Sequence, residues 1–174
     1  EIGCRLSDHS FPTFPSSFPS EEEARSIFEN ALNGESANPE EVSQFTGFIM
    51  LFLGRLYQAK GWTMQVHLGP LRNNASRLYK QFGPDAGTDS IGDWNQAQNM
   101  GKFLDKLDSE DSLPKTIVYN NNPADNFSIA TMLGNFQRDL PGKMQFGSGW
   151  WHLDQRDGME EQLKTLANVG LLSH

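Results

Sequence analysis

The stretch Thr63–Leu68, with the sequence TMQVHL, has the residue pattern that decides the fold. Apolar and polar side chains alternate along it, with Met64, Val66 and Leu68 on one side and Thr63, Gln65 and His67 on the other. This period of two predicts a β-strand with one apolar and one polar face. The preceding residues, from Asn38-Pro39 to Gly61, carry apolar side chains at helical spacing and predict a long helix before the strand.

Strands and helices of this kind alternate along the whole chain. Further short strands are predicted at 3–7, 115–119 and 143–146, and helix start signals occur at Ser20, Asn38, Asp93, Asn122 and Gln155. In this interpretation the first strand ends before Asp8, which begins a loop. Strand and helix alternate about four times, which predicts an α/β fold with a parallel sheet instead of a sandwich or a bundle.

Two architectures contain parallel βα units, and the loops favour one of them. A doubly wound sheet that binds nucleotides needs a turn such as GxGxxG or GxxxxGK[ST], and the sequence has neither. A (β/α)₈ barrel gathers polar residues at the carboxyl ends of its strands, where polar clusters occur here. About four βα units make half of such a barrel, which typically takes about 250 residues. Residues 1–174 are therefore expected to be one segment of a barrel, incomplete at both ends.

The composition argues against some classes of binding partner and indicates a cellular setting. The 174 residues include 14 Lys and Arg against 22 Asp and Glu, a net charge of −8, and no basic run, which argues against nucleic acid or an anionic membrane surface as the main partner. The longest apolar stretch, 48–53, is far shorter than the roughly 20 residues that span a bilayer. The single cysteine, Cys4, cannot form an intramolecular disulfide, so a reducing, cytoplasmic setting is expected. A homo-oligomer is a further expectation.

Four residues are candidates for a binding site. His67 lies on the polar face near the end of its strand and Arg72 follows five residues later, so a barrel would direct both at its mouth. An Arg fork suits a carboxylate because it donates two parallel hydrogen bonds. The structural alternative is that Arg72 pairs with a surface Asp and that His67 is hydrogen-bonded within the barrel. Asp8 and His9, after the first strand, either orient one another or a ligand, or Asp8 only caps a turn.

Other motifs indicate what the segment lacks. The four histidines form no HxH or HExxH pair, so a self-contained zinc site is not expected. No GxSxG elbow is present, and Cys4 has no recognisable activating base. Asp93 is interpreted as a helix cap. Trp150 and Trp151 end the last strand region, where they either pack or form a wall against a sugar ring.

Five stretches, taken in order, resemble the uronate (glucuronate) isomerases, a family placed with the metal-dependent amidohydrolase barrels. They are GCRLSDH at 3–9, MQVHLGPLRNN at 64–74, GPDAGTDSIGD at 83–93, NPADN at 122–126 with MLGNFQ at 132–137, and QFGSGWW at 145–151. The five blocks occur at matching spacing and run essentially from end to end of the chain. Together they are a specific signal, whereas any one block alone is not. The four strands would then correspond to the fourth through seventh of the barrel.

The resemblance implies an aldose–ketose isomerase of hexuronate metabolism (pentose and glucuronate interconversion). Such an enzyme interconverts D-glucuronate with D-fructuronate and D-galacturonate with D-tagaturonate by moving a proton between C2 and C1. In this reading Arg72 binds the C6 carboxylate, His67 lies near the sugar oxygens, and Asp8 and His9 line the same mouth.

The sequence also departs from that family. As the resemblance has it, a divalent metal, expected to be zinc, is held by an HxH pair on the first barrel strand and an Asp on the last, and neither is present. The isolated chain is therefore expected to be inactive, with metal ligands and proton-transfer groups outside it. Superfamily analogy alone would also suggest metal-dependent hydrolysis, but no residue here places an attacking water. The alternative from another class is a non-enzymatic carbohydrate-binding or assembly module that uses Trp150 and Trp151 as a sugar platform.

Overall fold

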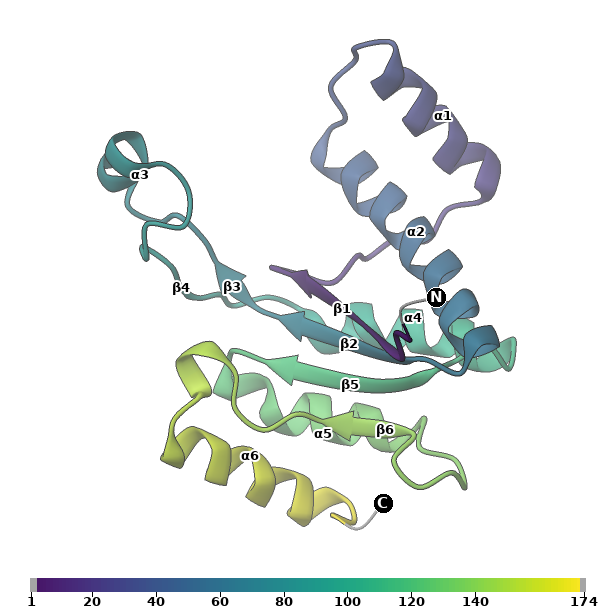
Figure 1. The fold of residues 1–174 in the computed structure, drawn as a ribbon, viewed down its shortest axis with the longest axis vertical. Coiled ribbons are helices and arrows are strands. Elements are labelled where there is room, and N and C mark those ends of the chain that lie inside the picture. Colours follow the sequence, from purple (N-terminus) through teal and green to yellow (C-terminus); the bar gives the residue numbers. More distant parts are fainter. Residues whose placement is uncertain (1–2, 173–174) are drawn as a thin grey trace.

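A computed structural model describes residues 3–172 and shows a four-stranded sheet with helices against one face (Figure 1). The strands of the sheet, in spatial order, are β1 (Leu6–Phe11), β2 (Thr63–Leu68), β5 (Lys115–Asn120) and β6 (Met144–Phe146). The helices are α1 (Glu21–Leu32), α2 (Pro39–Lys60), α3 (Ser76–Phe82), α4 (Gln96–Ser109), α5 (Asn126–Gly134) and α6 (Arg156–Val169). Two 3₁₀ turns, η1 (Pro123–Asp125) and η2 (Trp151–Leu153), precede α5 and α6.

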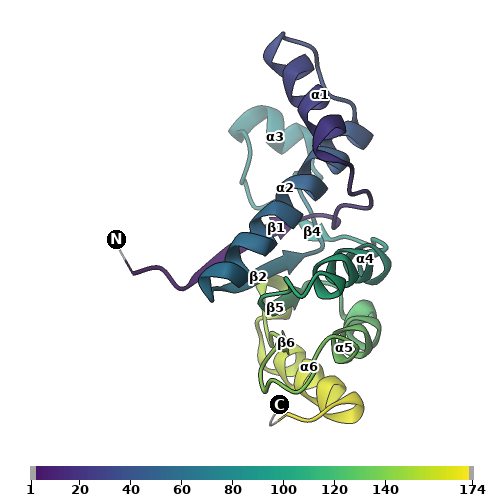
Figure 2. The ribbon, with the colours of Figure 1, turned by 90° about the vertical axis from the view of Figure 1, so that its right-hand side faces the viewer.

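All three strand pairings in the sheet are parallel, which confirms the predicted sheet. Figures 1 and 2 show α4 and α5 against one face, whereas no helix within residues 3–172 covers the other. Covering on one side only is what a segment of a (β/α)₈ barrel should show, because the inner faces of barrel strands face one another instead of a helix layer. The uncovered face is therefore the barrel interior.

The core lies between the sheet and the helices. Met64, Val66 and Leu68 are completely buried, which confirms the apolar face predicted for β2. They share one hydrophobic cluster with Phe103 and Leu107 of α4. Full burial of a side chain of this size contributes about 1.5–3 kcal/mol, so this layer holds the sheet to the helices.

The helix boundaries show why local signals were sufficient for α1 and α2. Ser20 and Asn38 both form capping boxes, each with a Glu three residues later, and Gly61 ends α2 in the left-handed conformation at φ 64°. The α1–α2 hairpin extends away from the sheet (Figure 2). Only part of the apolar stripe of α2 is therefore buried, and Phe52 is 50% exposed.

Several expected boundaries are wrong. Asp8 and His9 lie inside β1 instead of after it, because all six residues of β1 pair with β2. Asp93 caps no helix: α4 begins at Gln96 without a side-chain cap, and the N–H of Gly92 just before Asp93 donates to the Gly69 carbonyl at 2.8 Å. Asn122 caps η1 instead of α5.

The segment between β2 and α4 holds an element that was expected to be a loop. Strands β3 (Pro70–Leu71) and β4 (Ser90–Ile91) form a short antiparallel pair, with α3 between them. This arm projects beyond the carboxyl end of β2 (Figure 1). It carries Arg72 directly after β3.

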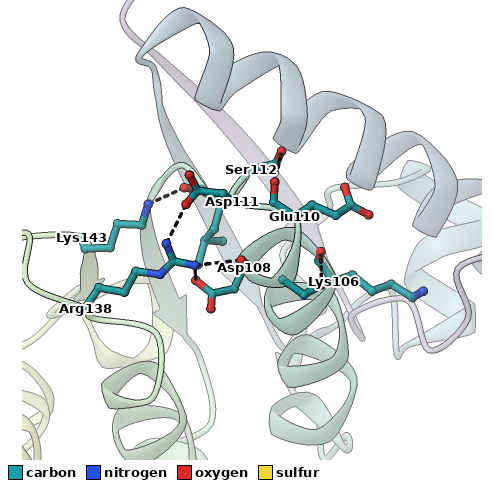
Figure 3. Close-up of polar contacts among 9 residues, drawn as sticks. Lys106, Asp108, Glu110, Asp111, Ser112, Arg138 and Lys143 are labelled. Atoms are coloured by element: carbon teal, nitrogen blue, oxygen red, sulfur yellow. Dashed lines mark hydrogen bonds and ion pairs between the residues drawn. The ribbon is translucent and has the colours of Figure 1, made fainter.

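A charge cluster ties the opposite end of the sheet together (Figure 3). Arg138 donates to the Asp111 carboxylate at 2.7 Å and to the backbone carbonyl of Asp108 at 2.8 Å. The Lys143 ammonium donates to the Leu113 carbonyl, and burial lowers the pKa of Lys143. These contacts lie where α4 leads into β5, at the amino ends of the strands, so the cluster belongs to the framework and not to the mouth.

Within the described part of the chain, no helix combines the length and apolarity needed to cross a membrane.

Candidate functional site

The register of the sheet brings polar side chains together on the uncovered face. Asp8 is level with Gln65, and His67 is level with Ser10 on one side and Tyr119 on the other. Residues in register across parallel strands point to the same face, and side chains two apart on one strand share that face. Asp8, Gln65, His67 and Tyr119 are therefore one surface built by three strands.

Asp8 and His67 are in direct contact. The Nδ1 atom of His67 lies 2.7 Å from Oδ1 of Asp8. The His67 side chain is only 15% exposed whereas that of Asp8 is 53% exposed. Because Asp8 lies within a strand, the alternative that it merely caps a turn does not describe its position. The contact joins two candidates that are 59 residues apart in sequence.

His9 lies elsewhere, and its expected place beside Asp8 at the mouth is wrong. Consecutive strand residues point to opposite faces, so His9 faces the helix side. Its Nε2 lies 3.0 Å from the hydroxyl of Tyr57 on α2. Burial lowers the pKa of His9, and the nearby Asp8 carboxylate partly opposes this. Its position is that of a packing residue between β1 and α2.

Arg72 reaches the rim from the β3–β4 arm. Its guanidinium lies 4.7 Å above the ring of Trp151, a cation–π contact. Its Nη1 lies 3.5 Å from Asp85 and 3.7 Å from Asp89, which are ion-pair distances but too long for strong hydrogen bonds. The side chain is 41% exposed. Arg72 thus pairs with the exposed Asp85, as the structural alternative predicted, and also lies against an aromatic face.

Two tryptophans connect Arg72 to His67. The ring of Trp150 lies 4.7 Å from that of His67, and the rings of Trp150 and Trp151 meet edge to face at 5.6 Å. Arg72 in turn lies over Trp151. We call Asp8, His67, Arg72, Tyr119, Trp150 and Trp151 the rim cluster. It lies at the carboxyl ends of β2, β5 and β6, and Asp8 joins it from the middle of β1.

The sequence interpretation missed Tyr119 as a site residue. Its ring stacks on His67 with centroids 4.4 Å apart and planes 7° from parallel, and its hydroxyl donates to Oε1 of Gln65 at 3.2 Å. One signal could have found it: β2 and β5 are both predicted strands, and His67 and Tyr119 are each the fifth residue of their strand.

Further buried polar side chains lie at the end of β5 and in the segments near it. Asn120 donates to the Asn126 side chain at 2.9 Å, and Asn122 to the Gly92 carbonyl at 3.2 Å. Burial raises the pKa of Asp125, and the charge of Asp93 raises it further. Within residues 3–172, four buried polar atoms here have no hydrogen-bond partner: Trp94 Nε1, Asn121 Nδ2, Asp125 Oδ2 and Asn126 Nδ2.

The described residues do not fit the divalent metal that the resemblance implies. Nowhere between residues 3 and 172 do three His, Cys, Asp or Glu side chains group so that they could hold a metal ion. Asp8 and His67 supply two such groups. Catalytic zinc sites need three protein ligands, so no step of the chemistry is assigned to a metal on this chain.

Comparison with known proteins shows the family of the chain. The sequence model of the family "Glucuronate isomerase" matches residues 1–174. The uronate isomerase of Solibacter usitatus is 53% identical over 99% of this chain, and that of Shouchella clausii is 52% identical, again over 99%. The chain spans 37% of the length of each.

Solved structures agree as well. The crystal structure of uronate isomerase from Thermotoga maritima superimposes on 97% of this chain with a TM-score of 0.85 at 32% identity, covering 36% of that protein. Glucuronate isomerase from Caulobacter crescentus shares the fold, with a TM-score of 0.82 at 22% identity, 95% coverage of this chain and 33% of that protein. The fold is thus the predicted partial (β/α)₈ barrel, and the chain belongs to the glucuronate isomerase family.

Proposed function

We propose that this chain supplies part of the substrate site of a uronate isomerase that interconverts D-glucuronate with D-fructuronate and D-galacturonate with D-tagaturonate. The observation that carries the proposal is the rim cluster, in which a guanidinium with available donors and a histidine are joined by two tryptophans at the carboxyl ends of the strands. That end of the strands is where barrel enzymes hold their substrates. Family membership supports the reaction class.

Arg72 is proposed to bind the C6 carboxylate. It donates no hydrogen bond within residues 3–172, and its ion-pair partners are 3.5 and 3.7 Å away. A carboxylate can therefore receive two parallel N–H donors from it. Trp151 packs against the guanidinium, with the guanidinium carbon 4.7 Å from its ring centroid. This contact selects uronates over neutral hexoses.

His67 is proposed to contact the sugar oxygens near the reacting carbons. Isomerisation moves a proton from C2 to C1, so that the C1 aldehyde becomes an alcohol while the C2 hydroxyl becomes a ketone, with no net gain or loss of atoms or electrons. A neutral imidazole at these oxygens can accept or return a hydroxyl proton. Nothing within residues 3–172 is assigned the C2 proton. We place that group, and the ligands of a divalent metal, in other segments of the intact enzyme.

A chimaera tests the proposal. In it, this chain replaces the matching segment of the Solibacter usitatus uronate isomerase, to which it is 53% identical. We expect the chimaera to isomerise D-glucuronate, and Arg72→Ala to raise KM for uronates. A chimaera that matches the host in circular dichroism, elution volume and metal content but does not isomerise uronates would refute the proposal.

The same chimaera separates the isomerase from a carbohydrate-binding module. A stacking platform would lose sugar binding in Trp150→Ala and be indifferent to the charge of the sugar. In the structure, however, Trp150 and Trp151 are already faced by His67 and Arg72, which leaves less of either ring for a sugar. We therefore expect Arg72→Ala, and not Trp150→Ala, to abolish the preference for uronates over neutral hexoses.

A further inference from the structure

We propose that Asp8 and Tyr119 are positioning residues that hold His67 in one tautomer and one ring orientation, and that Gly147 is required for this because it leaves room for the Tyr119 ring. The inference rests on the proposed function only for the role of His67 in the reaction. The arrangement itself is carried by contacts from β1, β2, β5 and the segment that follows β6, and it can be measured without catalysis.

Asp8 determines which nitrogen of His67 carries the proton. An ionised carboxylate only accepts hydrogen bonds, so the 2.7 Å contact requires a proton on Nδ1. Neutral imidazole then has its lone pair on Nε2, which has no hydrogen-bond partner within residues 3–172. Nε2 is therefore the atom that His67 offers to a substrate oxygen. The carboxylate of Asp8 also favours any positive charge that develops on the ring during proton transfer.

Tyr119 determines the plane of the His67 ring. The two rings are 4.4 Å apart and within 7° of parallel, so rotation of the imidazole would drive its edge into the phenol. Trp150 closes a second side at 4.7 Å and 59°. The hydroxyl of Tyr119 is used separately, in its hydrogen bond to Gln65. The ring of Tyr119, more than its hydroxyl, therefore orients His67.

Gly147 supports the other face of the Tyr119 ring. A Cβ added at Gly147 would lie 2.3, 2.5 and 2.8 Å from three atoms of that ring, although the backbone conformation of Gly147 is one that other residues adopt. The backbone N–H of Gly147 is bound to the Val118 carbonyl at 2.8 Å, so this backbone cannot simply withdraw. Tyr119 thus lies between Gly147, which directly follows β6, and the imidazole of His67 on β2. A side chain at 147 would collide with the Tyr119 ring, which is stacked on His67.

The tautomer is tested by nuclear magnetic resonance of the chimaera with ¹⁵N-histidine only in residues 1–174. This segment holds four histidines, and the His67 signals are identified by their loss in His67→Gln. We expect His67 to show protonated Nδ1 and unprotonated Nε2 at neutral pH, and Asp8→Asn to populate both tautomers, because an amide can accept from or donate to Nδ1. Protonated Nε2 in the unsubstituted chimaera, or no change in Asp8→Asn, would overturn the inference for Asp8.

Kinetics test the positioning role separately. Outer groups that orient a metal-bound histidine typically contribute about 10–100-fold to activity. By analogy, Asp8→Asn should lower kcat by about that factor with KM for D-glucuronate unchanged, since Arg72 sets binding. The matched control is Asp105→Asn, which removes the same charge from the exposed surface of α4. Retention of kcat within about twofold in Asp8→Asn would overturn the role.

Conservative variants test Tyr119. Tyr119→Phe keeps the ring and should retain kcat within about threefold, whereas Tyr119→Leu should lose about 10-fold or more. Loss of activity in Tyr119→Phe equal to that in Tyr119→Leu would overturn the positioning role and indicate chemistry by the hydroxyl. If the tautomer pattern holds while no variant isomerises uronates, the proposed function fails and the positioning of His67 stands.

Discussion

Gly147→Ala perturbs the rim cluster through one methyl group. The added Cβ would lie 2.3 Å from a ring carbon of Tyr119, and ordinary van der Waals contact begins at 3.4 Å, so the ring must move by 3.4 − 2.3 = 1.1 Å. Overpacking of this kind costs about 1–3 kcal/mol, and the lower entropy of the unfolded alanine chain offsets about 0.4–1 kcal/mol. We therefore expect a net destabilisation of about 0–2.6 kcal/mol.

The same displacement of the Tyr119 ring should reduce activity more than it reduces stability. Moving Tyr119 by about 1 Å displaces or tilts His67, and misplacement of a reacting group by that distance can cost about 100-fold in rate. The assay is urea unfolding of the chimaera followed by circular dichroism, together with kcat for D-glucuronate. Gly134→Ala is the matched control, because a Cβ at Gly134 in α5 has no neighbouring atom within 4 Å. It should be neutral or stabilise the protein by up to about 1 kcal/mol.

A double-mutant cycle isolates the contact. In a Tyr119→Ala background the ring is gone, so Gly147→Ala should become stabilising by about 0.4–1 kcal/mol, which implies a coupling of about 1–3 kcal/mol. The reasoning is refuted if Gly147→Ala stabilises the protein as Gly134→Ala does, or if its penalty persists without the Tyr119 ring.

Three further predictions concern other parts of the chain. Because the pKa of His9 is lowered from its ordinary 6.5, the unfolded state binds the proton more readily than the folded state. The free energy of unfolding should therefore decrease as the pH falls below about 6.5. Urea titrations from about pH 7.5 to 5 should show this decrease, and a smaller decrease in His9→Gln. Arg72→Ala should raise KM for D-glucuronate by about 10–100-fold, the loss of a charged hydrogen bond, and an unchanged KM would contradict carboxylate binding. Leu107→Ala, at a completely buried position, should cost about 2–5 kcal/mol in urea unfolding, whereas exposed Leu172→Ala should be nearly neutral.

Local signals were sufficient for most elements. The alternation in Thr63–Leu68 predicted the strand and its buried face, and Ser20, Asn38 and Gly61 predicted where two helices begin or end. These predictions succeed because a strand's faces and a helix cap depend on residues within a few positions. The prediction for Asp93 failed: α4 begins only at Gln96, and the backbone just before Asp93 makes a long-range contact from Gly92 to Gly69 that no local signal shows.

The candidate site was predictable only in part. His67, Arg72 and Asp8 were identified from their positions at strand ends, and the structure places all three in the rim cluster. His9 was misplaced because the length of β1 depends on its pairing with β2, and that pairing decides which of two neighbouring residues faces the interior. Tyr119 was missed because its importance comes from a ring 52 positions away in sequence.

By itself, the sequence determined the alternation of strands and helices, the parallel sheet, the apolar face of β2 and the family resemblance. Only the tertiary structure decided that Asp8 and His67 share a hydrogen bond, that Tyr119 lies flat on His67 over Gly147, and that the β3–β4 arm brings Arg72 over Trp151. The physical reason is the range of the forces involved. Strand and helix preferences are set by neighbours along the chain, whereas register between strands is set by the summed packing and hydrogen bonding of the whole sheet.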